Sequence, residues 1–189
     1  IRFYYDIGLT QPVYDNGIIG EYYNYYQYLP LRSESNLSST DFDRYVSALG
    51  YNTVPTSYAT LQSNQSMLVN QGAAFKFGEA KYGINSLLIY ALAMHESGSG
   101  RSSIAINYLN LYGWGAYDSN VGAAKRFNDI QSSIYEFMGL HIRGFISIEN
   151  WRFFSTSLGT KNSGLATKYA SDPYWANKIA GWAYRIDRY

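Results

Sequence analysis

The apolar segment 84–96 dictates much of the architecture expected of this chain. Its large side chains recur at the three- and four-residue spacing that gathers them on one face of an α-helix: Ile84, Leu87, Leu88, Ala91, Leu92 and His95. The helical pattern runs straight into Glu96, and Ser97-Gly98-Ser99-Gly100 follows. Two glycines in four residues favour a turn. We therefore predict a buried helix that ends at a carboxylate beside a glycine-opened turn.

Helical spacing also predicts most of the remaining structure. One helix is expected to be capped by Ser39 or Thr40. Further helices are expected to run from 67 to 82, to begin with a capping box at 133–136, and to begin at Asp172-Pro173; a helical turn is expected at 104–108. Little of the sequence alternates with a period of two, which is the pattern of a half-buried strand. The prediction is a mainly α fold with at most a short β-hairpin.

Length and composition indicate a folded chain with its own core. The 189 residues are 47% hydrophobic and only 15% charged, which suits one domain or a domain with a small lobe. Residues 1–66 are rich in Tyr, Ser, Asn and Thr. We expect them to form an arm or subdomain that packs on a core made by residues 67–189, although a detachable linker is the alternative.

Charge, hydropathy and cysteine content exclude several classes. Fifteen Lys and Arg against fourteen Asp and Glu is too balanced for a protein that grips nucleic acid by its phosphates. No segment reaches the roughly 18 apolar residues of a membrane span. Without cysteine and with only two histidines, we expect no metal site and no cofactor. Since the chain opens without Met, we expect a monomeric piece of a larger modular protein.

Aromatic residues are unusually frequent. The chain holds 21 Tyr, 9 Phe and 4 Trp. Aromatic rings with a polar tip can stack on sugar rings while their polar groups bond to hydroxyls, but a core built from tyrosine has the same composition. Composition alone leaves both interpretations open.

Two motifs narrow the choice. Residues 91–102 read Ala-Leu-Ala-Met-His-Glu-Ser-Gly-Ser-Gly-Arg-Ser, and Asn110-Leu111-Tyr112-Gly113 follows. Residues 168–179 read Lys-Tyr-Ala-Ser-Asp-Pro-Tyr-Trp-Ala-Asn-Lys-Ile. In this order, the two motifs resemble the glucosaminidase family of bacterial autolysins, glycoside hydrolase family 73. The resemblance covers roughly residues 67 to 184.

The resemblance implies a fold, a substrate and a location. The fold would be lysozyme-like and helical, with a substrate groove. The reaction would be cleavage of the β-1,4 bond between N-acetylglucosamine and N-acetylmuramic acid, so the partners would be the glycan strands of peptidoglycan. An autolysin of this kind would be secreted and would act in the bacterial cell wall.

Glu96 is the candidate catalytic acid. A carboxyl group at the end of a buried helix is partly desolvated, which raises its pKa toward the range that a general acid requires. A carboxylate that only caps a helix or forms a salt bridge is the alternative from spacing alone. The resemblance places Glu96 at the family's catalytic glutamate.

The second catalytic group has several candidates. Asp118 lies in the aromatic loop that would wall the groove and matches an Asp of the family, but it is also a good turn residue. Asp129 and Glu149 are weaker rivals. By resemblance, Tyr169 would lie near the acid and orient the acetamido group or a water. The substrate's own acetamido group is a further candidate nucleophile.

Five further residues are candidates for substrate binding: Asn110, Tyr112, Trp114, Tyr117 and Tyr174. Trp114 and Tyr117 interleave with glycines and are expected to stack on sugars, whereas Tyr112 also fits a position packed under the loop. Asn110 would bind substrate amides or fix the loop backbone. Tyr174 fits either the core or the groove.

Two other functions remain open. A muramidase or a lytic transglycosylase could use the same helix-borne glutamate on the same fold. A noncatalytic wall-binding module could use the aromatic loops to hold glycan without cleaving it. The identity of the new sugar ends separates the first pair from a glucosaminidase, and an absence of cleavage would indicate the binding module.

Overall fold

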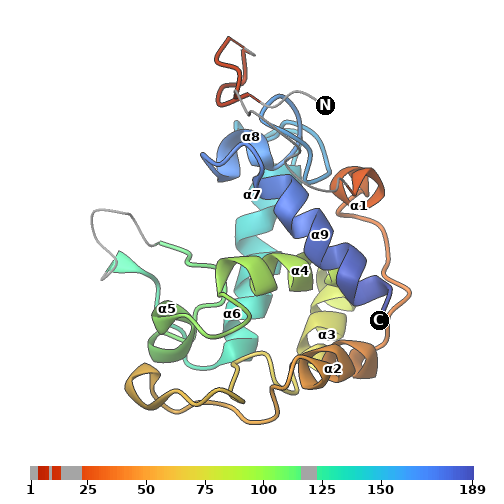
Figure 1. Cartoon of the computed structure of the whole chain (residues 1–189). Helices are drawn as coiled ribbons and strands as arrows, with labels where there is room; N and C mark the ends of the chain where they lie inside the picture. The colour runs from red at the N-terminus through yellow and green to blue at the C-terminus, as the bar shows by residue number, and fades with distance from the viewer. Residues whose placement is uncertain (1–3, 9, 14–22, 116–122) are drawn as a thin grey trace.

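The computed structural model describes residues 4–8, 10–13, 23–115 and 123–189 (Figure 1). The described elements are α1 (Asn24–Tyr28), α2 (Ser39–Ala48), the 3-10 turn η1 (Tyr58–Thr60), α3 (Gly72–Tyr82), α4 (Ser86–Glu96), α5 (Ser103–Asn107), α6 (Ile130–Glu136), the π-helical segment η3 (Phe137–Ile142), α7 (Arg143–Ile146), α8 (Ala166–Tyr169) and α9 (Trp175–Asp187). Extended pairing within these ranges is limited to isolated bridges, such as Thr160 with Ser163. The predicted mainly α fold is confirmed.

Helix α4 forms the centre of the core. Every residue from 86 to 94 is buried, and α9 and α3 both pack against the helix (Figure 1). The Asn85 side chain caps it by accepting a hydrogen bond from the Leu88 amide at 3.0 Å. Helix α4 ends at Glu96, as predicted. Because this helix is buried on all sides, its last side chains have a fixed position.

The turn after α4 requires its last glycine. Gly98, Ser99 and Gly100 all have positive φ, a region that costs glycine little. A Cβ atom on Gly100 would also approach the amide nitrogens of Met67 and Leu68 to 3.0 Å. The turn therefore packs closely on the segment before α3, which fixes the direction of the chain beyond Glu96.

The segment 23–66 contributes to the same core. Leu31 and Phe42 are fully buried. The Leu31 amide donates to the Thr156 carbonyl at 2.7 Å, and the Leu31 carbonyl accepts from the Asn85 amide at 2.7 Å. These contacts tie this segment to both the start of α4 and the loop before α8. Whether 1–66 and 67–189 are separate units stays a prediction.

Three helices begin at other residues than predicted. Helix α2 has Ser38 as its N-cap, one residue earlier, with a capping box to Asp41. Helix α3 begins at Gly72 instead of 67 and ends at Gly83 as predicted. Helix α9 begins at Trp175, because Asp172 forms a turn by accepting from the Tyr174 amide at 2.9 Å. In all three helices an apolar residue of the predicted face is buried: Phe42 in α2, Phe75 in α3 and Ile179 in α9.

The predicted capping box at 133–136 is wrong. Helix α6 is capped by Asp129, whose Oδ1 accepts from the Ser132 amide at 2.6 Å. Ser133 lies inside the helix, and its hydroxyl accepts from the Leu111 amide at 3.2 Å. Glu136 forms an ion pair with Lys125. Both side chains therefore anchor neighbouring loops and do not cap the helix.

Within the described ranges, no helix combines the length and the apolar character needed to cross a membrane. The same part of the chain holds no group of three or more His, Asp or Glu side chains arranged to hold a metal ion.

Candidate active site

A cavity of about 480 Å³ opens at the end of α4. Four segments line it: Glu96 at the end of α4, the loop 112–115, His141 and Phe145 from η3 and α7, and the segment 168–172. These segments are far apart in the sequence, and the packing around α4 brings them together. Among the described residues, the cavity lining combines two carboxyl groups, those of Glu96 and Asp172, with several aromatic rings.

Glu96 is positioned by the first residue of α9. The Trp175 indole Nε1 donates a hydrogen bond to Glu96 Oε1 at 2.7 Å. Burial raises the pKa of the Glu96 carboxyl, and the hydrogen bond from Trp175 opposes this only in part. Among the described residues, no basic side chain forms an ion pair with Glu96. A carboxyl group of this kind stays protonated to higher pH than an exposed glutamate, so it can donate a proton to a ligand.

Tyr169 lies beside this pair. Its ring stacks on Trp175 with centroids 4.7 Å apart. Burial raises the pKa of the Tyr169 hydroxyl well above its usual value, and the nearby charge of Glu96 adds to the effect. Tyr169 is therefore a neutral phenol that can donate or accept a hydrogen bond but does not act as an anion.

Tyr112 forms part of the cavity wall in an unusual state. Its ring stacks on Phe137 at 3.6 Å with the planes 4° apart. Its hydroxyl is buried and has no hydrogen-bond partner among the described residues. Leaving a buried hydroxyl unpaired costs about 1–3 kcal/mol. A ligand that formed a hydrogen bond with the Tyr112 hydroxyl would remove this cost.

Asn110 holds the loop that carries Tyr112 and Trp114. Its amide nitrogen donates to the carbonyl oxygens of Trp114 and Lys125, both at 2.9 Å. Its amide oxygen accepts from the backbone amides of Tyr112 at 3.2 Å and Trp114 at 3.1 Å. Both ends of the side chain are thus engaged with backbone, which is the second of the two roles that the sequence left open.

Trp114 is partly exposed and is held from behind. The Lys125 ammonium lies 4.4 Å from the centre of its ring, and the Lys125 amide donates to the Trp114 carbonyl at 2.9 Å. A cation over an aromatic face contributes about 0.5–1 kcal/mol at an exposed site. Trp114 therefore presents its ring to the cavity in a supported position.

His141 is the centre of the aromatic wall. Its ring lies 5.0 Å from Trp114, 5.3 Å from Phe137 and 5.8 Å from Tyr169. Burial, with a smaller effect from Arg152, lowers the pKa of His141 to about 4. The imidazole is therefore neutral over most of the pH range and packs as an aromatic ring.

The segment 168–172 is held by a buried lysine. The Lys161 ammonium donates to the carbonyl oxygens of Ala166 and Thr167 at 3.0 and 3.4 Å, and also to that of Ala170. These carbonyls lie at the end of α8, where a positive charge is favourable. Lys161 thereby fixes the turn that presents Tyr169 to the cavity.

The structure brings four of the predicted site residues together around one cavity: Glu96, Tyr112, Trp114 and Tyr169. Asn110 lies behind the loop, and Tyr174 is the N-cap of α9 and does not line the cavity. Asp118 and Tyr117 lie outside the described residues.

The weaker rivals for the second catalytic group lie elsewhere. Asp129 caps α6, and Glu149 is exposed and does not line the cavity. Among the described residues, Asp172 is the other carboxylate of the lining, and it forms an ion pair with Lys178 at 2.6 Å. It is committed to that lysine and to the turn before α9.

Sequence reasoning missed three residues of this site. The sequence places His141 and Phe145 at helical spacing on one apolar face, and this spacing gives no sign that the face also borders a cavity. Lys161 carries no sequence signal at all, because its role depends on carbonyl groups that converge only in the folded chain.

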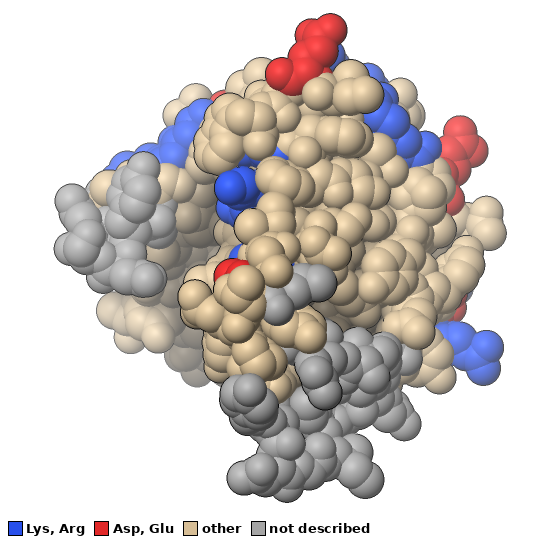
Figure 2. All heavy atoms as spheres, turned by 90° about the horizontal axis from the view of Figure 1, so that it is seen from above, with Lys and Arg blue, Asp and Glu red and all other residues tan. Residues whose placement is uncertain are grey.

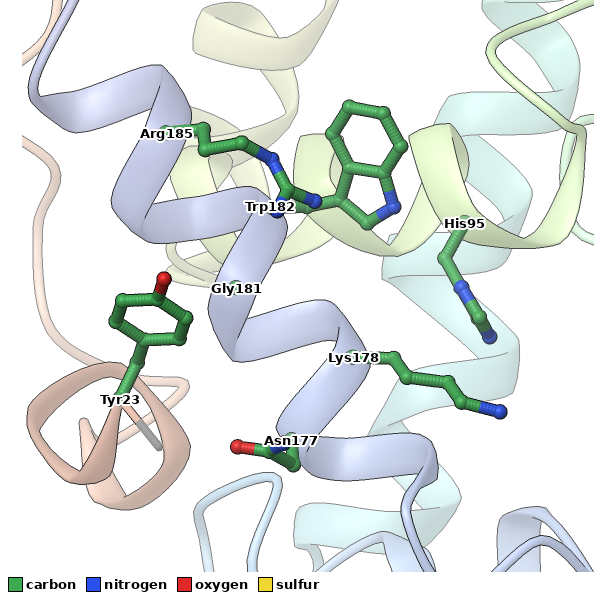
Figure 3. A pocket seen from close by; sticks show the side chains of 7 residues that line it. All are labelled: Tyr23, His95, Asn177, Lys178, Gly181, Trp182 and Arg185. Carbon is green, nitrogen blue, oxygen red and sulfur yellow. The ribbon is translucent and has the colours of Figure 1, made fainter. Parts of the chain in front are cut away.

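A second cavity, of about 340 Å³, lies over α9. Figure 3 shows Tyr23 on one side, His95 on the other, and Lys178 and Trp182 on α9 between them. No carboxyl group of the described residues lines it. Although His95 is adjacent to Glu96 in sequence, it belongs to this second cavity, so the acid and the histidine do not share a site.

Comparisons with known proteins identify relatives of this arrangement. The sequence model of the family named Glucosaminidase and described as mannosyl-glycoprotein endo-beta-N-acetylglucosaminidase matches residues 72–188. Two curated proteins from strains of Streptococcus pneumoniae, which carry the provisional name endo-beta-N-acetylglucosaminidase, are 39% identical over 131 residues. The match covers 69% of this chain but only 19% and 18% of theirs. The chain thus spans about a fifth of the curated relatives' length.

Solved structures share the fold. A catalytic mutant of S. aureus autolysin E in complex with the disaccharide NAG-NAM aligns with a TM-score of 0.60 and 19% identity, covering 90% of this chain and 74% of that one. A structure described as Major Bifunctional Autolysin aligns with a TM-score of 0.56 and 23% identity, covering 88% and 70%. The predicted lysozyme-like helical fold is confirmed.

Proposed function

Because this chain belongs to the glucosaminidase family, we propose that it is an endo-β-N-acetylglucosaminidase that hydrolyses the β-1,4 bond between N-acetylglucosamine and N-acetylmuramic acid in peptidoglycan. The names of its relatives support this activity. So does the disaccharide NAG-NAM held by S. aureus autolysin E, a protein of the same fold. The proposal is that the glycan lies in the cavity at the end of α4.

Glu96 acts as the general acid in this proposal. The observation that carries it is the position of the carboxyl group: partly buried, with a raised pKa, hydrogen-bonded by Trp175 and open to the cavity. The protonated carboxyl donates its proton to the glycosidic oxygen as the bond breaks. Trp175 donates its hydrogen bond to Glu96 Oε1. The proton to be transferred is therefore carried by Oε2.

In this proposal, Tyr169 orients the substrate's acetamido group or a water. As a neutral phenol beside Glu96, it can hold the acetamido group or a water by a hydrogen bond. We assign the second catalytic role to Asp118, with the substrate's own acetamido group as the alternative. If the substrate's own acetamido group is the nucleophile, Tyr169 is the residue that places the acetamido oxygen for attack.

Aromatic residues bind the sugar rings. Trp114 offers a supported ring for stacking, and we assign sugar stacking to Tyr117 as well, from its place in the sequence. The unpaired hydroxyl of Tyr112 donates to a substrate oxygen. Asn110 acts indirectly, by holding the loop that carries Tyr112 and Trp114. Tyr174 contacts the glycan strand only outside the cavity.

The setting of the enzyme follows from its substrate. We propose that it is secreted and acts in the bacterial cell wall as a monomeric part of a larger modular protein. The curated relatives support the modular arrangement, because this chain matches only about a fifth of their length.

The test is replacement of Glu96 by Gln, followed by turnover of purified peptidoglycan. We expect activity to fall by at least about 10²–10⁴-fold, because Gln has the shape of Glu but no proton to donate. Since burial disfavours the charged carboxylate, the melting temperature at pH 7 should stay the same or rise. Glu149→Gln, which changes an exposed carboxylate outside the cavity, is the matched control. Full activity in Glu96→Gln would refute the assignment.

A further inference from the structure

Trp151 is an exposed aromatic residue that the proposed reaction does not use. Its side chain is 74% exposed, in the loop that follows α7. Exposing a large indole to water is unfavourable, and Trp is enriched at binding interfaces. The question is therefore what this ring meets.

The turn beneath Trp151 is well fixed. The Asn150 amide donates to the Ser147 carbonyl at 3.0 Å, and the Phe153 amide donates to the Asn150 carbonyl at 2.9 Å. The Asn150 side chain accepts from both the amide and the Nε of Arg152, at 3.1 and 3.2 Å. The indole thus stands on a turn that hydrogen bonds hold on both sides.

Two contacts connect this turn to the cavity of Glu96. The Arg152 guanidinium lies 4.7 Å from the ring centre of Phe145, and Phe145 lines the cavity. Lys168 also lines the cavity, and its ammonium lies 5.8 Å from the Trp151 ring and 5.4 Å from that of Phe154. Trp151 therefore lies next to Lys168, a residue of the cavity lining, and is not an isolated surface residue.

The surroundings suit a neutral ligand. Figure 2 views the molecule from above and shows mostly uncharged residues on that face, with Lys and Arg at several places both inside it and along its edges. Among the described residues, the Lys168 ammonium lies beside the Trp151 ring and the Arg152 guanidinium lies over Phe145, whereas a polyanion would require a denser cluster of cations. A flat apolar ring with one adjacent donor matches a pyranose, which has an apolar face and hydroxyls at its edge.

We propose that Trp151 and Lys168 form a distal sugar-binding subsite of the same groove. Trp151 stacks on a sugar ring of the glycan strand beyond the sugars at Glu96, and Lys168 donates a hydrogen bond to an oxygen of that ring. This inference rests on the proposed function. Its consequence is that the enzyme binds long strands more tightly than a disaccharide.

The test measures binding in the Glu96→Gln background, so that the ligand is not consumed. The ligands are glycan strands freed of stem peptides and the disaccharide of N-acetylglucosamine and N-acetylmuramic acid. We expect Trp151→Ala to weaken binding of long strands about tenfold and to leave disaccharide binding unchanged. Trp151→Phe should recover part of the loss, because it keeps a ring. Tyr25→Ala on α1 is the control, since Tyr25 is 70% exposed and does not line the cavity.

The outcomes separate the two proposals. Equal long-strand binding by Trp151→Ala and its parent would overturn the subsite while leaving the proposed function intact. The same loss for long strands and disaccharide would also overturn it, because the ring would then act at Glu96. If neither ligand binds the parent protein, the proposed function itself fails, and the subsite fails with it.

Discussion

At the scale of single residues, the role of general acid proposed for Glu96 predicts how activity depends on pH. A general acid works only while protonated, so activity falls as pH rises through the pKa of Glu96. Burial raises that pKa, and the hydrogen bond from Trp175 lowers it. Removing the indole N–H should therefore raise the pKa further.

We predict that Trp175→Phe keeps the protonated acid to higher pH. Phe preserves a ring beside Tyr169 but donates no hydrogen bond to Glu96. The alkaline limb of the kcat/KM profile should move upward relative to the wild type. A limb that stays in place, or that moves to lower pH, would show that the ionisation of Glu96 does not govern it.

Tyr112 gives a prediction in which stability and activity move in opposite directions. Its hydroxyl is buried and unpaired within the described structure, so Tyr112→Phe removes a cost to the free enzyme and keeps the stack on Phe137. The melting temperature should stay constant or rise. Activity should fall about 10- to 100-fold, because a hydrogen bond to substrate is lost.

The control for Tyr112 is another partly buried tyrosine whose hydroxyl is paired. The Tyr26 hydroxyl donates to Asp187 Oδ2 at 2.6 Å. Tyr26→Phe should lower the melting temperature and leave activity unchanged. If Tyr112→Phe behaves like Tyr26→Phe in both measurements, the hydroxyl of Tyr112 has no role toward substrate.

The sequence points to Glu96 as the candidate acid but does not reveal its environment. Glu96 was accessible because a long buried helix and a glycine turn mark its position. The hydrogen bond from Trp175 was not, because it joins residues 79 apart whose approach depends on how α9 crosses α4. Asn110 shows the same limit: its two possible roles differ only in contacts between loops.

At the scale of elements, a buried carboxylate joins three segments. Glu79 on α3 accepts from the Ser35 amide at 2.8 Å and the Ser86 amide at 2.9 Å and forms an ion pair with Lys76. It thereby satisfies an amide at the start of α4 and ties the segment before α2 to the core. Its side chain is only 8% exposed.

We predict that Glu79→Gln destabilises the fold by about 2–4 kcal/mol. The variant loses the negative charge to which both amides and Lys76 bond, and it leaves the partly buried Lys76 ammonium with the Ser35 carbonyl, at 3.0 Å, as its remaining partner in the described structure. Chemical denaturation measures the change. Glu34→Gln is the control, because Glu34 is exposed close by and should change stability by less than about 0.5 kcal/mol. Similar stabilities for the two variants would contradict the role given to Glu79.

The element boundaries show which local signals decide. The end of α4 and the end of α3 at Gly83 were predicted, since glycine and apolar spacing act locally. The start of α6 was missed because Ser133 and Glu136 fit a capping box by type alone. Asp129 caps the helix earlier, and the loop 110–115 requires the Ser133 hydroxyl for itself.

At the scale of the whole molecule, aromatic residues lie both in the core and around the cavity at the end of α4. Tyr90 and Phe42 stack inside the core at 4.7 Å, whereas Tyr112, Trp114 and Tyr169 surround the cavity. Composition could not assign them, because burial depends on the packing of distant segments. The core and the cavity wall are continuous, so the wall is as fixed as the core.

The fold should lose stability in weak acid through its neutral histidines. The pKa of His141 is about 4 in the folded protein against 6.5 ordinarily, and burial lowers that of His95 as well. The unfolded chain therefore takes up protons first as pH falls from about 6.5 to about 4. Over this range the free energy of unfolding should decrease.

We predict that His141→Phe reduces this acid sensitivity. Phe keeps an aromatic ring in the cluster and removes one titrating group. Melting temperatures of the two proteins between pH 7 and pH 4 measure the effect, and the variant should lose less stability than the wild type. Parallel curves would mean that His141 is already protonated in the fold or does not contribute.

The proposed glucosaminidase activity depends most directly on which bond the chain cleaves. Purified peptidoglycan is digested with the wild type and with Glu96→Gln, the new ends are reduced with borohydride, and the reduced sugar is identified after hydrolysis. We predict reduced glucosamine from the wild type and almost none from the variant. Reduced muramic acid would indicate a muramidase on the same fold, and an absence of new ends from the wild type would contradict catalysis by Glu96 altogether.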